Sequence, residues 1–208
     1  MLPLEIIMTF FTASVLLGMA PGPDNIFVLT QSALRGRGAG LAVVLGLCTG
    51  LILHTMAVAL GVAVIFQTSA VAFTVLKFFG VGYLLYLAWQ AFRASAQAVR
   101  GTGREAYSYW GYYGRGIMMN VTNPKVSLFF LAFLPQFADP HRGPVVYQML
   151  FLGVLFIIAT ILVFGSIALL AGTLGQYLNR SQRVQLILNR LAGTVFIALA
   201  IKLATSQR

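Results

Sequence analysis

Two short segments place a charged residue directly after a proline within otherwise apolar sequence. The first reads APGPDNIFV, where Asp24 follows Pro23, and the second reads TNPKV, where Lys125 follows Pro124. A carboxylate and an ammonium group in one cavity complement a zwitterion, whose own charged groups have the opposite signs. The two segments therefore predict a binding site for a zwitterionic molecule such as an amino acid.

Polar residues next to the two charges would complete this site with hydrogen-bonding groups. The predicted substrate-binding residues are Asp24, Asn25, Asn120, Asn123 and Lys125, with Thr122 as a further polar neighbour. A second interpretation is that Asp24 and Lys125 only neutralise each other across the interior of the protein. A salt bridge that forms in the empty state and opens to admit the ligand would reconcile the two interpretations.

Both segments also have the features of a helix break followed by a helix start. Pro21, Gly22, Pro23 and Pro124 are the predicted break residues. Gly22 and Asn123 each precede a proline, and a proline is favoured at the first position of a helix. Each new half-helix would then begin at its proline.

The two charges would occupy equivalent positions, the second of each half-helix. An anion near a helix N-terminus is stabilised by about 0.3–1 kcal/mol, which favours Asp24 and disfavours Lys125. A charge at the bilayer centre costs about 2.5–3.5 kcal/mol on insertion scales. We therefore expect Lys125 to need an anion, which would be Asp24 or a bound ligand.

The composition is that of an integral membrane protein. Hydrophobic residues make up 59% of the 208 residues and charged residues only 9%, against about 45–50% and 25% in soluble domains. Six apolar segments are long enough to cross a bilayer. They are 3–34, interrupted at 21–24, then 41–66, 71–92, 111–137, interrupted at 123–125, and finally 145–171 and 188–205.

Arginines occur mainly in alternate connections between these segments. Arg35 and Arg37 lie between the first two, Arg93 follows the third, and Arg183 and Arg190 precede or open the last. The positive-inside rule places these connections in the cytoplasm and both termini outside. Because the basic residues are dispersed among spans, the net charge of +10 does not indicate nucleic-acid binding.

The order of the segments predicts an all-α membrane protein built from two inverted repeats of three helices, with the first and fourth helices broken. The chain would be one transport domain, residues 1–208, with repeats of about 1–100 and 101–208. Tandem units of three spans cross the membrane in opposite senses. Secondary transporters with this plan bind their substrates near the midplane, at the broken helices.

Other residues carry less specific signals. His54, in the second segment, is either a proton relay, alongside Asp24, or a hydrogen-bonded packing residue. Gly46 and Gly50 form a small-residue face for close packing, within the bundle or in a homodimer. No spacing typical of a catalytic triad, a metal site or a phosphate-binding loop is present, so we expect neither an enzyme nor a bound cofactor.

The two break segments resemble the signature segments of the LysE/RhtB family of amino-acid exporters. The resemblance rests on GMAPGPDNIFVLTQSALRGRGAGLAVVLGLCTG and NVTNPKVSLFFLAFLPQF, and extends to FFGVGYLLYLAWQAFR and LNRLAGTVFIALAIKLA. It implies a multi-pass protein of the bacterial inner membrane. It also implies export of amino acids or their derivatives, driven by proton antiport.

Two other functions remain as alternatives. A metal-cation exporter on a related scaffold would need several oxygen or sulfur ligands within the membrane, whereas Asp24 is the only acidic residue in the middle of a predicted span. A non-transporting membrane scaffold would use the charged pair for stability alone.

Overall fold

In a computed structural model of the chain, the fold is all-helical, as predicted. The structure describes residues 2–62, 70–94, 107–180 and 182–205, and these contain no β-strand. The expected boundary between repeats, near residue 100, lies outside the described residues.

The first half of the chain contains both pieces of a broken helix and two long helices. They are α1 (Leu4–Met19), α2 (Pro23–Arg35), α3 (Arg37–Ala57), which continues into a π-helical turn η1 (Val58–Val62), and α5 (Ala70–Arg93). Gly36, with φ of 88°, makes the tight turn between α2 and α3, a conformation that glycine adopts without steric cost.

The second half repeats this order. It contains α6 (Tyr109–Thr122), α7 (Pro124–Leu128), the π-helical turn η2 (Phe129–Phe133), the 3-10 turns η3 (Leu134–Phe137) and η4 (Pro140–Arg142), α8 (Val145–Arg180) and α9 (Gln182–Thr205). Helix continues through most of the segment between the last two predicted spans, because α8 extends to Arg180 and α9 begins at Gln182. This segment has no proline to end a helix.

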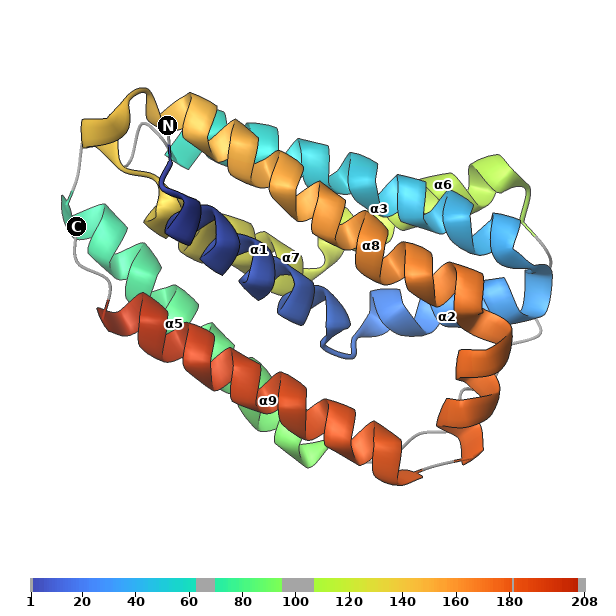
Figure 1. Cartoon of the computed structure of the whole chain (residues 1–208). Coiled ribbons are helices and arrows are strands. Elements are labelled where there is room, and N and C mark those ends of the chain that lie inside the picture. Colours follow the sequence, from blue (N-terminus) through green and yellow to red (C-terminus); the bar gives the residue numbers. More distant parts are fainter. Residues whose placement is uncertain (1, 63–69, 95–106, 181, 206–208) are drawn as a thin grey trace.

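The long helices pack with their axes nearly aligned (Figure 1). α3 contacts both α6 and α8, while α5 and α9 form a pair along one side of the bundle. The core between them is rich in aromatic rings: Phe10 packs edge-on against Phe137, and Phe129 and Phe130 both contact Phe156. These contacts join α1, the α7–η3 segment and α8.

Three helical segments of the described chain are long and apolar enough to cross a membrane: Arg37–Gly61, Val145–Ala171 and Gln185–Thr205. The number rises to five if each bent pair, α1 with α2 and α6 with α7–η3, forms one span. The predicted third span corresponds to α5, which has 24 residues. The six-span inverted repeat remains a prediction.

The glycine face of α3 packs inside the chain. A side chain at Gly46 would overlap the backbone of Tyr113 and Gly116 of α6, and one at Gly50 would overlap Asn120. Such close approach of two helix backbones requires small residues. The sequence left open whether this face packs within the bundle or in a dimer, and the structure assigns it to the α3–α6 contact.

Candidate functional site

The first helix break lies between α1 and α2, whose axes differ by 62°. Proline has no backbone N–H, so Pro21 cannot donate to the Leu17 carbonyl as the next turn of α1 would. Pro23 is the first residue of α2, after the extended Gly22. The break therefore leaves backbone carbonyls at the C-terminal end of α1 that need other donors.

Lys125 and Asn25 supply these donors. The Lys125 ammonium donates to the carbonyls of Ala20, at 3.0 Å, and Leu17, at 3.3 Å. The Asn25 side-chain amide donates to the Gly18 carbonyl at 2.7 Å. A cation at a helix C-terminus is also favoured by the helix dipole. A lysine of the second half of the chain thus caps a half-helix of the first half.

Gly22 leaves room for the lysine. A Cβ atom at this position would lie 3.2 Å from the Lys125 Nζ atom, closer than a methyl group normally approaches an ammonium nitrogen. The φ of Gly22 is −165°, which any residue can adopt. Glycine therefore matters here for space rather than for backbone conformation.

The second break lies between α6 and α7, whose axes differ by 51°. Pro124 lacks the N–H that would bond to the Asn120 carbonyl in a continuous helix. His54 of α3 lies 3.2 Å from this carbonyl through Nε2. Because a carbonyl oxygen only accepts, Nε2 must be the donor, which fixes the proton on that nitrogen.

Asn123 connects the two breaks. Its side-chain oxygen accepts from the Lys125 backbone N–H at 3.0 Å, capping α7. Its Nδ2 donates to Oδ2 of Asp24 at 2.7 Å. Asp24 is only 3% exposed, and its Oδ1 has no hydrogen-bond partner among the described residues. One face of the Asp24 carboxylate is thus held while the other remains available.

Asp24 and Lys125 do not form an ion pair. Their charged atoms lie beyond 4.0 Å, although they are near enough to interact electrostatically. In the structure, Lys125 binds backbone carbonyls rather than the Asp24 carboxylate, because its long side chain reaches from the start of its own helix to the carbonyl end of α1. Each charge is held by neutral dipoles from the other half of the chain.

The structure gathers most, but not all, of the predicted residues. Asp24, Asn25, Asn123 and Lys125 meet at the breaks. Asn120 is buried against Gly50 of α3, with its Oδ1 unpartnered. Thr122 lies outside the site, because it is exposed and its hydroxyl bonds the Met118 carbonyl of its own helix.

The backbone carbonyls of Leu17, Gly18 and Ala20 also belong to the site, although they were not among the residues predicted from the sequence. The available signal was Pro21, because a proline in an apolar helix leaves the carbonyl four residues earlier without a donor. Within the described residues, no group of three or more His, Cys, Asp or Glu side chains could hold a metal ion.

Comparison with known proteins places the chain in a family. The model of the LysE type translocators matches residues 15–207. The chain belongs to this family. Its members are translocators rather than enzymes, so the protein is a membrane transporter that acts on a small molecule.

Similar proteins match over almost their whole length. Homoserine/homoserine lactone efflux proteins of Salmonella typhi and Salmonella typhimurium are each 32% identical over 198 residues, which cover 95% of this chain and of the relative. A protein described as an uncharacterized membrane protein from Vibrio cholerae serotype O1 is 32% identical over 203 residues, or 96% of this chain and 97% of its own length. No solved structure matches significantly.

Proposed function

We propose that this protein is a secondary transporter that exports amino acids or amino-acid derivatives across the bacterial inner membrane, by proton antiport. The observation that carries the proposal is the junction of the two helix breaks, where Asp24 and Lys125 lie close together without an ion pair. The export of homoserine and homoserine lactone by two relatives, as their names state, supports the substrate class and the direction.

The junction offers complementary groups for an amino acid. The unpartnered Oδ1 of Asp24 can accept from a substrate ammonium. The Lys125 ammonium can leave the Leu17 and Ala20 carbonyls to meet a substrate carboxylate. Because Lys125 is held by backbone carbonyls rather than by a carboxylate, its movement breaks no ion pair. Binding of the substrate carboxylate to Lys125 would then free the C-terminal end of α1 from the lysine.

Some of the helix contacts support two inverted halves, although α2 packs on α3 and α8, whereas α7 makes no comparable contact with either in the described chain. Exchanging the halves pairs the α1–α2 segment with α6–α7, α3 with α8, and α5 with α9. Under this exchange, the contact between α1 and α8 corresponds to the contact between α6 and α3. Both contacts are present in the structure. The α3–α8 and α5–α9 contacts map onto themselves, as a two-fold axis requires. We propose six spans on this basis, with α5 as the third.

The arginines support the proposed orientation. Arg35, Arg37, Arg93 and Arg183 lie where α2 ends, α3 begins, α5 ends and α9 begins, at one end of the bundle (Figure 1). The start of α1 and the end of α9 lie at the other end. The positive-inside rule then places the arginine-rich end in the cytoplasm.

For coupling, we propose that Asp24 exchanges a proton for the substrate. Its Oδ1 is buried and has no partner in the described chain, so a proton and a substrate ammonium would compete for the same atom. His54 is the alternative relay, although its Nε2 is engaged with the Asn120 carbonyl. Metal-cation export is not favoured, since the described residues contain no metal-ligand cluster and Lys125 would repel a cation.

Transport by the purified protein in proteoliposomes tests the proposal. We expect a pH gradient to drive uptake or release of radiolabelled L-homoserine or L-threonine. Loss of transport in Asp24→Asn and Lys125→Gln, with normal amounts of protein in the membrane, would support the site. Each change removes charge-assisted hydrogen bonds to the substrate and should reduce transport at least about tenfold.

Lys77→Gln is the matched control for loss of a lysine. Lys77 lies in α5, where its ammonium donates to the Ala204 carbonyl at 3.4 Å, away from the breaks. This variant should transport normally. Normal transport by both Asp24→Asn and Lys125→Gln would contradict the site, and absence of any amino-acid transport in the unmodified protein would contradict the function.

A further inference from the structure

A cavity lies at the end of the bundle opposite the arginine-rich end. It has a volume of about 220 Å³ and is formed between α1, the η2–η3 segment and α9. The residues that matter for its chemistry are Glu5, Thr9, Phe133, Gln136, Lys202 and Leu203. In the proposed orientation it faces the outside of the cell.

This cavity also contains a carboxylate and an ammonium group that do not pair. Glu5 is one of only four acidic residues in the chain. It is near enough to Lys202 to interact electrostatically, yet their charged atoms are more than 4.0 Å apart. The Lys202 ammonium lies over the ring of Phe137, at 5.0 Å from its centre. The two charges therefore face one space that a ligand can enter.

We propose that this cavity is a second binding site for the transported amino acid, occupied on the outer side during release. The inference rests on the proposed function. The substrate ammonium would bind Glu5, and its carboxylate would bind Lys202. Thr9 and Gln136 line the cavity with further polar groups, and the ring of Phe137 offers an apolar surface to the substrate side chain.

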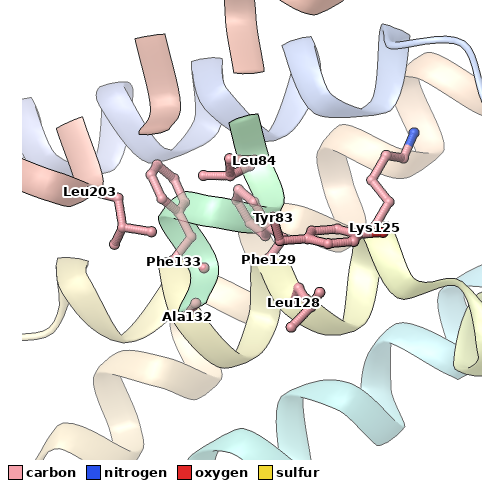
Figure 2. A pocket seen from close by; sticks show the side chains of 9 residues that line it. Tyr83, Leu84, Lys125, Leu128, Phe129, Ala132, Phe133 and Leu203 are labelled. Carbon is pink, nitrogen blue, oxygen red and sulfur yellow. The ribbon is translucent and has the colours of Figure 1, made fainter. Parts of the chain in front are cut away.

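An apolar barrier separates this cavity from the helix breaks. Lys125 lines a small internal cavity of about 10 Å³, which is room for about one water molecule and not for an amino acid. Figure 2 shows Lys125 at one end of this small cavity and Phe133 with Leu203 at the other. Phe133 and Leu203, each 1% exposed, also line the outer cavity.

Phe133 and Leu203 therefore stand between the two sites. Phe133 ends the π-helical turn η2 and is followed by the 3-10 turn η3. Both are less regular than an α-helix, and such turns often mark functional sites and hinges. In the structure described here the barrier is closed, so an amino acid in the outer cavity would be separated from the central site.

Binding to the full-length protein in lipid nanodiscs tests the inference. The probes are radiolabelled L-homoserine and L-homoserine lactone, at pH 6, below the usual pKa of an α-amino group. The lactone keeps the amine but has no free carboxylate. We expect two binding components for homoserine. Lys202→Gln should weaken one of them at least about tenfold for homoserine while changing lactone binding less than about twofold.

The matched variants separate the two sites. Glu5→Gln should weaken the same component for both probes, because both carry the amine. Lys125→Gln should weaken only the other component, and Lys77→Gln should change neither. Glu5 and Lys202 are exposed, so their replacement should not prevent folding.

The outcomes distinguish this inference from the proposed function. A single homoserine component that responds to Lys125→Gln but not to Glu5→Gln or Lys202→Gln would overturn the outer site and leave the function intact. A component that responds to Glu5 and Lys202 alone would support the outer site and contradict the central one. No binding of either probe would contradict both proposals.

Discussion

Asn123 donates a 2.7 Å hydrogen bond to Asp24 and so ties together two helix breaks that are 99 residues apart in sequence. The same side chain accepts from the Lys125 backbone N–H. One residue therefore starts α7, fixes the orientation of the Asp24 carboxylate and sets the position from which Lys125 reaches the end of α1. A change at Asn123 should disturb both halves of the site.

Asn123→Asp should disrupt this junction severely. The aspartate can still cap α7, but it replaces the donor to Asp24 with a second carboxylate oxygen. Loss of the donor alone costs about 1–3 kcal/mol for a buried acceptor, and repulsion adds to it. We expect the protein level in the membrane and the thermal stability in detergent to fall, and transport to be lost.

Exchanging the two residues provides the control. In the double variant Asp24→Asn with Asn123→Asp, the new amide at position 24 can donate to the new carboxylate at 123. We expect membrane level and stability to recover relative to Asn123→Asp. If the double variant is no more stable than the single one, the hydrogen bond does not join the breaks.

The sequence was sufficient to predict the breaks but not what holds them. Pro21, Pro23 and Pro124 interrupt apolar segments, and the effect of proline on a helix is local. The partners of Lys125 could not be predicted, because they depend on how far a flexible side chain extends across a tertiary contact. The donor to the Asn120 carbonyl, His54, lies on α3, and only the packing of α3 on α6 brings it there.

The end of α8 and the start of α9 could not be predicted from the sequence either. The predicted membrane spans end at residue 171 and begin again at residue 188, whereas α8 extends to Arg180 and α9 begins at Gln182. Apolar composition identifies the part of a helix that lies in lipid. It does not indicate where a helix ends once it has left the membrane, because polar residues such as Gln and Arg are good helix formers.

His54→Gln should preserve transport and its dependence on the proton gradient. A glutamine amide can donate to the Asn120 carbonyl as Nε2 of His54 does, but it does not titrate. His54→Leu removes the donor, and because the Asn123 N–H still bonds this carbonyl, we expect destabilisation of only about 0.5–1.5 kcal/mol. Proton-driven transport in proteoliposomes and thermal stability would be measured for both variants. Loss of proton coupling in His54→Gln would instead identify a proton relay.

Gly116→Ala should separate α3 from α6. A methyl group at Gly116 would overlap the backbone of Val43 and Leu47, and overpacking of this kind costs about 1–3 kcal/mol. Gly114→Ala, on the same helix, meets nothing within 4 Å and should be neutral or stabilising by about 0.5–1 kcal/mol. Thermal unfolding in detergent would measure the difference. Equal stability of the two variants would contradict the α3–α6 packing.

Asp139 should make the turn before α8 sensitive to acid. The hydrogen bond from the His141 N–H, together with Arg142, lowers the pKa of the Asp139 carboxyl. Because this pKa is lowered by folding, the ionised Asp139 stabilises the turn. This stabilisation is complete above the pKa of the unfolded state and is lost as the pH falls through the pKa of the folded state. Hydrogen-exchange protection of the His141 amide, corrected for intrinsic rate, should therefore fall as the pH drops below about 4, the usual pKa of an aspartate. Asp139→Asn keeps an acceptor but cannot titrate, so its protection should not change with pH in this range.

Gly22→Ala should displace the Lys125 ammonium without unfolding the protein. The new Cβ atom would lie 3.2 Å from Nζ, so the flexible end of the lysine must shift by a few tenths of an ångström. This shift would weaken its hydrogen bonds to the Ala20 and Leu17 carbonyls, and we expect transport to fall measurably. Gly18→Ala is the matched control, because its Cβ atom would make only ordinary contact with Val163, at 3.6 Å. Both variants should reach the membrane in normal amounts. Equal transport by the two variants would show that the position of Lys125 at the end of α1 does not matter for function.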